Sequence, residues 1–536
     1  MSVPATPAAW QLERDAEGVA WLTLDVPGSS ANTLGRAVMQ ELDAWLAELE
    51  AEPPRGLVIR SGKPSGFIAG ADIREFRGVE TEQGAYELVR AGQRVLDRLE
   101  ALPCPSVALL QGFALGGGLE LALACRYRIA VSDDRLTLGL PEVMLGIHPG
   151  FGGTVRAVRL LGATVALDLM LTGRNVRADK AERLGLVDRL VPTATDLDAA
   201  ARAVIAAPPP RRRAPLKERA LSWGMLRPFV RGRVLAQLRR KARPEHYPAP
   251  YAIVDLWARH GAHGAAAYEA EARSIARLFL TPTSRSLVRV FGLQDRLKAL
   301  GGRDRAPLQR VHVVGAGVMG GDIAAWCAAR GLDVTLQDRA LEYIEPALGR
   351  ARELFVKRLR DPARVTAAAE RLHADVEGAG AETADVVIEA IFENLDAKRE
   401  LYARLEASMP SAALLASNTS SIPLEDLASG RRDPGRLLGL HFFNPVAQMP
   451  LVEVVSSAST RPEAAEAALA FARQIDKLPL PCRSSPGFLV NRVLVPYLHE
   501  AMYAAAEGIP LATIDRAAIE FGMPMGPIEL ADTVGL

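Results

Sequence analysis

Short apolar runs alternate with amphipathic stretches over the first two hundred residues. The runs 19–24, 57–60 and 106–110 are rich in β-branched and large apolar residues, which predicts strands. Between the first two of them, residues 36–50 carry apolar side chains at helical spacing. Strands that alternate with helices are typical of an α/β domain with crossover connections.

This alternation stops near residue 208 and returns about a hundred residues later. Pro208-Pro-Pro-Arg-Arg-Arg213 interrupts it, and residues 214–306 are rich in arginine and alanine with little strand signal, so we predict a helical connector there. Strand patterns then return at 311–314, 333–338 and 384–390. After Pro486 the pattern is helical to the last residue.

The composition and net charge favour an enzyme that acts on small molecules. The 536 residues exceed what one hydrophobic core usually serves, so several domains are expected. A net charge of +1 lacks the basic excess of nucleic-acid-binding proteins. The four cysteines are far apart and form no CxxC pair, which argues against a disulfide framework or a metal site and fits a reducing compartment. The sequence opens without a secretory signal, and its most apolar stretch, 107–125, contains Gln111, three glycines and Glu120, so we expect no integral membrane segment.

Three segments in the first 160 residues place glycines beside an acid or a free backbone amide. They are residues 68–72, 112–120 and 140–153. Glycine lets the backbone approach a ligand closely, and amides at a helix N-terminus point together at developing negative charge. The turn at Gly116–Gly118, which enters a predicted helix, is such a place.

These segments, and residues 15–200 as a whole, resemble the crotonase or enoyl-CoA hydratase superfamily. The resemblance implies an oxyanion hole formed by the amides of Ala71 and Gly117, and two catalytic glutamates, Glu120 and Glu142. Two carboxylates that hold one water can take a proton from it while C2 of an enoyl thioester gains one. Taken singly, each glutamate is better explained by capping or by solvation of its element than by catalysis. Their joint placement in both motifs favours a hydratase.

A second candidate site lies in the middle of the chain, at residues 310–321. A β-branched run leads into Gly315-x-Gly317-x-x-Gly320 and a helix of small residues, and Asp338 ends the next predicted strand. An acid at that position accepts hydrogen bonds from a ribose diol and repels a 2′-phosphate, so the pattern predicts NAD as cofactor rather than NADP. The residues expected around the cofactor at this turn are Gly315, Gly317, Val318, Met319 and Gly320.

Five later segments resemble, in order, the 3-hydroxyacyl-CoA dehydrogenase family. They are residues 388–394, 416–421, 439–445, 451–455 and 486–492. The resemblance implies that His441 removes the proton of the 3-hydroxyl group and that Glu453 orients His441 and stabilises its imidazolium form. It also places Ser420, Asn444 and Asn491 around the substrate and Glu393 near the nicotinamide ribose. From the residues alone, His441 and Glu453 meet only if neighbouring strands or turns bring them together.

The order of the parts resembles the multifunctional fatty-acid oxidation family, which comprises α-subunits of bacterial complexes and their peroxisomal relatives. The implied fold is α/β, with a crotonase-like ββα-spiral domain, a helical connector, a Rossmann NAD-binding domain and a partial all-helical C-terminal domain. The expected boundaries are 1–205, 206–306, 307–485 and 486–536.

The implied function is syn hydration of trans-2-enoyl-CoA to (S)-3-hydroxyacyl-CoA, followed by NAD-dependent oxidation to 3-oxoacyl-CoA. Isomerisation of 3-enoyl-CoA to 2-enoyl-CoA is an additional activity that the sequence permits. The implied partners are acyl-CoA substrates and a thiolase β-subunit, with no nucleic acid, and the implied location is the bacterial cytoplasm.

One alternative stays open at this stage. Family members continue with further helices, so we expect the C-terminal domain to be truncated, which also hides any peroxisomal targeting tripeptide. In the alternative, an active hydratase or isomerase precedes a truncated NAD-binding module that serves for docking and does not turn over.

Overall fold

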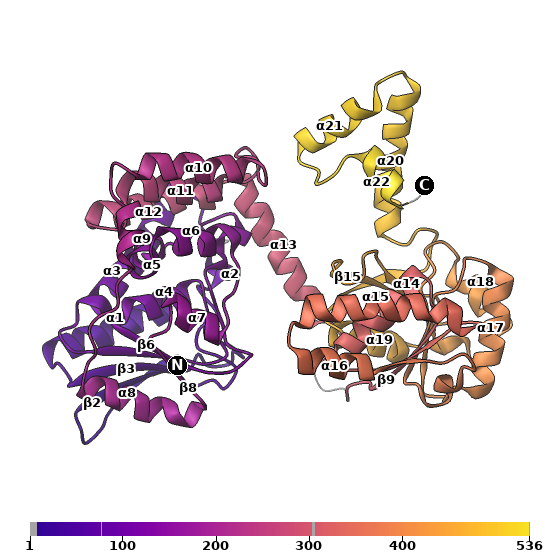
Figure 1. Ribbon diagram of the computed structural model, residues 1–536, viewed down its shortest axis with the longest axis horizontal. Coiled ribbons are helices and arrows are strands. Elements are labelled where there is room, and N and C mark those ends of the chain that lie inside the picture. Colours follow the sequence, from indigo (N-terminus) through magenta and orange to yellow (C-terminus); the bar gives the residue numbers. More distant parts are fainter. Residues whose placement is uncertain (1–7, 77, 303–305, 535–536) are drawn as a thin grey trace, which may run out of the picture. The chain divides into compact units, whose positions relative to one another are not determined.

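The computed structural model describes residues 8–76, 78–302 and 306–534. The chain forms two compact units, Met1–Phe291 and Gly292–Leu536 (Figure 1). Each unit has a sheet of its own and its own buried apolar clusters. The predicted α/β class is confirmed.

The first unit is built on a six-stranded sheet in which all neighbours are parallel except the first pair. In sheet order the strands are β1 (Trp10–Arg14), β2 (Val19–Leu24), β3 (Gly56–Ser61), β4 (Ser106–Leu110), β6 (Tyr127–Val131) and β8 (Arg189–Val191). A separate parallel pair consists of β5 (Phe113–Leu115) and β7 (Thr137–Gly139). The three strands predicted at 19–24, 57–60 and 106–110 are β2, β3 and β4.

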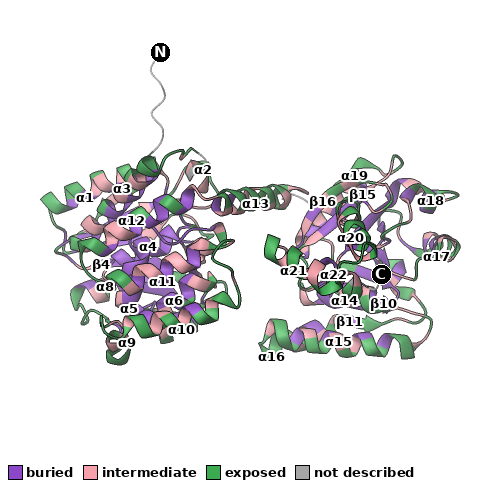
Figure 2. Ribbon diagram, turned by 90° about the horizontal axis from the view of Figure 1, so that it is seen from above, coloured by how far each residue is buried: buried purple, intermediate pink, exposed green. Residues whose placement is uncertain are grey.

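Both faces of this sheet are covered, which explains why its central strands are apolar throughout. Leu22 and Ile59 point into a large cluster with helices α1 (Arg36–Ala51), α3 (Glu82–Ala101) and α4 (Gly117–Ala124). Trp21 and Val58, their immediate neighbours, pack on the other face against α8 (Leu197–Ala206). Successive side chains of a strand point to opposite faces, so each strand supplies both clusters. Helix α4 is buried along its whole length (Figure 2).

Before the predicted connector, the remaining elements of the first unit are short helices that surround the sheet and α4. They are α2 (Ile73–Phe76), the 3-10 helix η1 (Pro141–Leu145), α5 (Gly153–Leu161), α6 (Ala163–Thr172), α7 (Ala178–Leu184) and η2 (Ala194–Asp196).

The predicted connector is helical. Its helices are α9 (Leu216–Leu221), α10 (Arg227–Arg239), α11 (Pro248–His260), α12 (Ala265–Phe279) and α13 (Pro282–Ala299). Part of it belongs to the first unit, because Ala272 and Ile275 of α12 are buried in one cluster with Val89 of α3 and with Ile147. The connector therefore contributes to the core beside the first candidate site.

The second unit contains an eight-stranded sheet. In sheet order its strands are β11 (Leu372–Ala374), β10 (Asp333–Gln337), β9 (Arg310–Val314), β12 (Val386–Glu389), β13 (Leu414–Ser417), β14 (Leu437–Phe442), β15 (Leu451–Ser456) and β16 (Leu478–Arg483). The first six strands in this sheet order, from β11 through β9 to β14, are parallel and follow the Rossmann order 3-2-1-4-5-6. Strand β15 runs antiparallel to β14. The Rossmann domain expected from the glycine motif is confirmed.

Helices accompany this sheet and continue beyond it to the last described residues. Those of the Rossmann part are α14 (Val318–Ala329), α15 (Leu341–Leu359), α16 (Pro362–Glu370), α17 (Leu395–Ser408), α18 (Leu424–Ala428) and α19 (Pro462–Gln474), with 3-10 helices η3 (Ala379–Thr383) and η4 (Pro434–Arg436). The helical tail consists of α20 (Val490–Ala506), α21 (Leu511–Phe521) and α22 (Pro527–Val534). It begins three residues later than the predicted start at Gly487, because the backbone turns at Phe488, where φ is +48°. None of the helices in the described ranges is both long and apolar enough to span a membrane.

Two candidate active sites

The first candidate site forms where α4 begins. Gly116 precedes the helix with φ +51°, a conformation that side chains disfavour, and a Cβ on Gly118 would lie 2.5 Å from the carbonyl oxygen of Ile68. This close approach brings the amide of Gly117 toward that of Ala71, since an ideal Cβ on Gly117 lies 3.4 Å from the Ala71 nitrogen. Neither of these two N–H groups donates a hydrogen bond within the described part of the chain. Both are free to bind a ligand oxygen.

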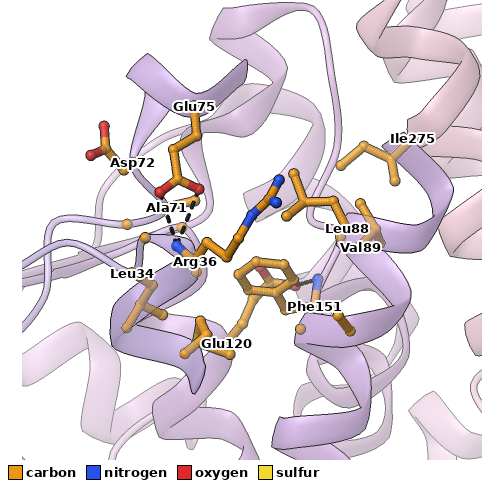
Figure 3. A pocket seen from close by; sticks show the side chains of 18 of the residues that line it. Leu34, Arg36, Ala71, Asp72, Glu75, Leu88, Val89, Glu120, Phe151 and Ile275 are labelled. Atoms are coloured by element: carbon orange, nitrogen blue, oxygen red, sulfur yellow. Dashed lines mark hydrogen bonds between the residues drawn. The ribbon is translucent and has the colours of Figure 1, made fainter. Parts of the chain in front are cut away.

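A cavity of about 620 Å³ opens over these amides. Ala71 and Gly117 line it, together with both predicted glutamates. Leu88 and Val89 of α3 and Ile275 of α12 form an apolar side of the cavity (Figure 3). The space suits a molecule with one reactive polar end and an apolar body.

Glu120 lies in the first turn of α4 and is buried. Its Oε1 accepts hydrogen bonds from the amides of Phe151 and Gly153, each at 2.7 Å, and the first of these contacts appears in Figure 3. Burial raises the pKa of Glu120 well above its ordinary value, and the negative charges of Glu142 and Glu271 act in the same direction. This carboxyl group is fixed in position and reluctant to ionise.

Glu142 lies in η1, and both of its carboxyl oxygens are buried without a hydrogen-bond partner among the residues that the structure describes. Burial raises its pKa to about 8, and the charge of Glu271 adds to the effect. A buried polar group without a partner is costly, so such groups are concentrated where a ligand or water completes them. Glu142 thus offers two free oxygens to the same cavity in which Glu120 is held.

The second candidate site pairs a histidine with a glutamate across two antiparallel strands. The register of β14 and β15 places His441 directly opposite Glu453, and the His441 Nδ1 to Glu453 Oε2 distance is 2.7 Å. The other oxygen of Glu453 accepts hydrogen bonds from the amides of Leu489 (2.9 Å) and Val490 (2.8 Å). Burial opposes ionisation of Glu453, but the bonds from His441 and these amides outweigh it and lower its pKa. A carboxylate in this position favours the tautomer with the proton on Nδ1, in which the lone pair of Nε2 is free to accept a hydrogen bond.

A buried ionic network lies at the carboxyl ends of β12 and β13. Lys398 of α17 is buried and contacts Glu389 at 2.8 Å and Glu393 at 2.9 Å. Glu393 also accepts hydrogen bonds from Thr419 and Ser421, on either side of the predicted substrate residue Ser420. Burial opposes its ionisation, but these bonds and Lys398 lower the pKa of Glu393 to about 2. Glu393 is thereby fixed as an anion beside Ser420.

The glycine turn fits a dinucleotide. A Cβ on Gly320 would lie 1.8 Å from the carbonyl oxygen of Gly315, so this glycine is required for α14 to pack against β9. Gly317 precedes α14 and has nothing within 4 Å of its Cβ position. Asp338 follows β10, and its Oδ2 accepts a hydrogen bond from Ala316 at 2.8 Å, so the acid closes the turn. The open side of the turn is where a pyrophosphate could approach the backbone.

Replacing Gly317 by alanine is expected to weaken NAD binding at least about tenfold without lowering thermal stability. The added methyl group meets no protein atom, and φ at this position is −59°, which alanine adopts freely. It would meet a pyrophosphate that approaches the turn closely. Titration of NAD, monitored by protein fluorescence or calorimetry, measures the change.

The matched control for this test is Gly349→Ala. Gly349 also has an open Cβ position and lies inside α15. It should bind NAD like the wild type. Equal NAD affinity of Gly317→Ala and the wild type would contradict the placement of the cofactor.

The predicted site residues fall into two sets: those that share a cavity or a hydrogen bond, and those that, in the part of the chain that the structure describes, do not bond to the other members of their site. Glu120 and Glu142 share the cavity with Ala71 and Gly117, and His441 bonds to Glu453. Three further predicted residues have no hydrogen bond to His441 within the described ranges: Ser420, Asn444 and Asn491. Asn444 precedes a cis peptide bond to Pro445. The sequence did not indicate that two further residues contribute to these sites. They are Lys398, whose burial is not marked by any motif, and Glu271, which lies in the connector.

Two candidate sites of different kinds therefore point to the class: an enzyme with a crotonase-type unit and an NAD-dependent dehydrogenase unit. Family models agree. The model "Enoyl-CoA hydratase/isomerase" matches residues 14–216, and the models of the NAD-binding domain and the C-terminal domain of 3-hydroxyacyl-CoA dehydrogenase match residues 310–485 and 487–536.

The chain also has relatives of known name and structure. It is 39% identical over 545 residues to the fatty acid oxidation complex subunit alpha of Vibrio cholerae, an alignment that covers 98% of this chain and 76% of that protein. Among solved structures, FadB2 of M. tuberculosis is 35% identical, with a TM-score of 0.42, over 43% of this chain and 83% of that one. The 3-hydroxybutyryl-CoA dehydrogenase of Escherichia coli K12 is 37% identical, with a TM-score of 0.41, over 43% and 50%.

The chain belongs to the family of fatty acid oxidation complex alpha subunits. It is a bifunctional enzyme with enoyl-CoA hydratase and NAD-dependent 3-hydroxyacyl-CoA dehydrogenase activities. The alternative of a non-catalytic NAD-binding module is not favoured by these matches. A peroxisomal location is not borne out either, because the relative is bacterial.

Proposed function

We propose that the cavity of the first unit hydrates trans-2-enoyl-CoA through Glu120 and Glu142, with the amides of Ala71 and Gly117 as the oxyanion hole. One observation carries this proposal: two buried carboxyl groups with raised pKa values line the same cavity as two unused amides. The four groups supply an acid, a base and a site for an oxyanion.

The chemistry follows from how these groups share protons. Burial and mutual repulsion oppose ionisation of both carboxyl groups, so at neutral pH the pair retains a proton. The ionised carboxylate takes a proton from water while the water oxygen attacks C3. The protonated carboxyl group delivers its proton to C2. The amides of Ala71 and Gly117 bind the thioester oxygen, whose negative charge grows as the C3–O bond forms. The product is the (S)-3-hydroxyacyl-CoA expected for the family.

In the second unit we propose that His441 is the base for oxidation of that product. Glu453 keeps Nδ1 protonated, so Nε2 accepts the proton of the 3-hydroxyl group and the carboxylate stabilises the imidazolium that results. NAD supplies the hydride acceptor. Gly315, Gly317, Val318, Met319, Gly320 and Asp338 would hold the dinucleotide, and Glu393 would lie at its nicotinamide ribose. Ser420, Asn444 and Asn491 would hold the substrate.

Several finer properties are also proposals. The same glutamate pair can move a proton between C2 and C4, which would isomerise 3-enoyl-CoA to 2-enoyl-CoA. The name of the Vibrio cholerae relative describes one subunit of a complex, and we propose a thiolase β-subunit as partner and the bacterial cytoplasm as location. The four-part division at residues 205, 306 and 485 likewise stays a prediction.

The experiment that tests the proposal mixes the purified protein with a short trans-2-enoyl-CoA and NAD and records NADH absorbance. NADH is expected to appear after a lag during which 3-hydroxyacyl-CoA accumulates, because the product of the first site is the substrate of the second. Addition of 3-hydroxyacyl-CoA directly should remove the lag. Absence of NADH from both substrates would contradict the proposed dehydrogenase site, and loss of enoyl absorbance without NADH would leave only the hydratase.

A further inference from the structure

Four consecutive amides at the start of α5 bind two different carboxylates in alternation. The amides of Phe151 and Gly153 donate to Glu120. The amides of Gly152 and Thr154 donate to Glu271, at 2.6 Å and 3.0 Å. A single short segment, residues 151–154, therefore connects the proposed catalytic Glu120 to a second glutamate, and neither carboxylate can move without disturbing the amides of the other.

Glu271 comes from a distant part of the sequence. It lies in α12, 119 residues after Gly152 and outside residues 14–216, which the hydratase model matches. The side chain is fully buried and also accepts hydrogen bonds from the hydroxyl of Thr154 and, at 2.9 Å, from Gln93 of α3. So many donors on one buried carboxylate fix both its position and the loop beneath it.

A second contact ties the same helix to the same loop. His148 is buried and lines the cavity, and its Nε2 lies 2.9 Å from the hydroxyl of Ser274, one turn after Glu271. Its Nδ1 donates to the carbonyl oxygen of Pro149 at 2.7 Å. Burial lowers the pKa of His148 to about 4, so it stays neutral near pH 7. Helix α12 therefore bonds to residues 148–154 through two side chains, Glu271 and Ser274.

The charge of Glu271 also reaches the catalytic pair. Burial raises the pKa of Glu271 itself, and its negative charge contributes to the raised pKa values of Glu120 and Glu142. Arg156 of α5 donates to the carbonyl oxygen of Phe151, and its charge is paired with two carboxylates of α3, Asp97 and Glu100. Gln93 of α3 is neutral and donates from Nε2 to Glu271. Its Oε1 accepts a hydrogen bond from Arg90. His148, which is neutral, bonds to Ser274 on the same helix as Glu271.

We propose that Glu271 is a positioning residue of the hydratase site: it fixes the 151–154 loop that holds Glu120. The proposal rests on the proposed role of Glu120 and Glu142. It gives the connector helix a part in hydration: the crotonase-type unit is complete only when α12 supplies this carboxylate.

The test compares the full-length protein with its Glu271→Gln and Glu271→Asp variants in the hydration of a short 2-enoyl-CoA, with kcat and KM measured from pH 5 to 10. Glutamine removes the charge and offers an N–H group to amides that need an acceptor. We expect kcat to fall about a hundredfold with little change in KM, because the acyl-binding cavity is intact while Glu120 is misplaced. Both limbs of the pH profile of kcat should move to lower pH, because loss of a nearby negative charge lowers the pKa of each catalytic carboxyl.

Glu271→Asp keeps the charge and should recover part of kcat, with the pH profile at its wild-type position. The matched control is Glu269→Gln on the same helix, whose carboxylate instead pairs with Tyr86 and Arg273 near the surface. It should behave like the wild type. A purely structural role would lower the thermal stability of Glu271→Gln and leave the pH limbs in place.

The proposal is overturned if Glu271→Gln keeps the wild-type kcat, or if its pH profile does not move. If that variant fails to fold, Thr154→Val removes one donor to Glu271 and leaves all four amides intact. A smaller drop in kcat is then expected, and wild-type kcat in both Thr154→Val and Glu271→Asp would overturn the inference. A wild-type protein without hydratase activity would instead contradict the proposed function itself.

Discussion

Replacing Glu142 by glutamine is expected to lower kcat for hydration by about three orders of magnitude. The substitution preserves shape but removes a group that exchanges a proton with the substrate or water, a contribution typically of about 10² to 10⁴. Glu120→Gln should have a similar effect, and the double variant should be little worse than either alone, because the two carboxyl groups act as one unit. Loss of enoyl absorbance at saturating substrate measures each rate.

The same substitution is expected to raise thermal stability at neutral pH. The pKa of Glu142 in the folded protein is about 8, against an ordinary value of 4.5. The folded state therefore binds a proton that the unfolded state releases, so this residue makes the protein less stable as pH rises from about 4.5 to about 8. Glutamine has no such pH dependence. Melting temperatures of Glu142→Gln and the wild type should converge at low pH and diverge toward pH 8.

Controls separate the chemistry from the fold. Glu182→Gln changes a glutamate of α7 that lies outside the cavity, and it should leave hydration unchanged. Oxidation of 3-hydroxyacyl-CoA should proceed at the wild-type rate in Glu142→Gln, since that reaction takes place in the other unit. Hydration at more than a tenth of the wild-type rate in both single variants would refute the assignment of the glutamate pair.

Much of the fold could be predicted because local pattern and global structure agree. The apolar runs at 19–24 and 106–110 form central strands with both faces buried. The turn at Gly116 and the turn at Gly315 stand out because each requires a backbone that only glycine adopts easily. Motifs of this kind mark a candidate site through local constraints, whereas the roles predicted for its residues come from the resemblance to known families.

What the sequence left open is what depends on packing between distant segments. Twelve residues separate His441 from Glu453, and only the antiparallel register of β14 and β15 shows that they lie opposite each other. Glu271 gave no local signal at all, because an acid in an amphipathic helix is usually solvated. Its role follows from the amides that it meets 119 residues away. Buried polar contacts of this kind cannot be inferred from periodicity, which reports only which face is apolar.

Replacing His441 by glutamine is expected to reduce NADH formation about a thousandfold while hydration continues unchanged. The residue is the base of the proposed oxidation, and a glutamine cannot accept the hydroxyl proton. In the coupled assay, 2-enoyl-CoA should therefore disappear while 3-hydroxyacyl-CoA accumulates. The accumulated intermediate can be measured by chromatography. NAD affinity should not change, because His441 has no part in the proposed dinucleotide turn.

A companion variant, Glu453→Gln, tests why the base works. Glu453 accepts from His441 with one oxygen and from Leu489 and Val490 with the other. In the variant the amide oxygen should face those two backbone N–H groups, which leaves the amide NH₂ pointing at Nδ1. That arrangement favours the tautomer with the proton on Nε2, where the substrate proton must go, so the rate should fall by a factor of about 10³ to 10⁴.

The control for both variants is His373→Gln, an exposed histidine of β11 in the same sheet, which should oxidise 3-hydroxyacyl-CoA normally. The two losses should also differ in their pH dependence. The remaining activity of His441→Gln should rise with hydroxide concentration, because the side-chain base is gone, whereas Glu453→Gln still has the imidazole. If His441→Gln instead forms NADH at the wild-type rate, the base must be another residue, and the His441–Glu453 pair is structural.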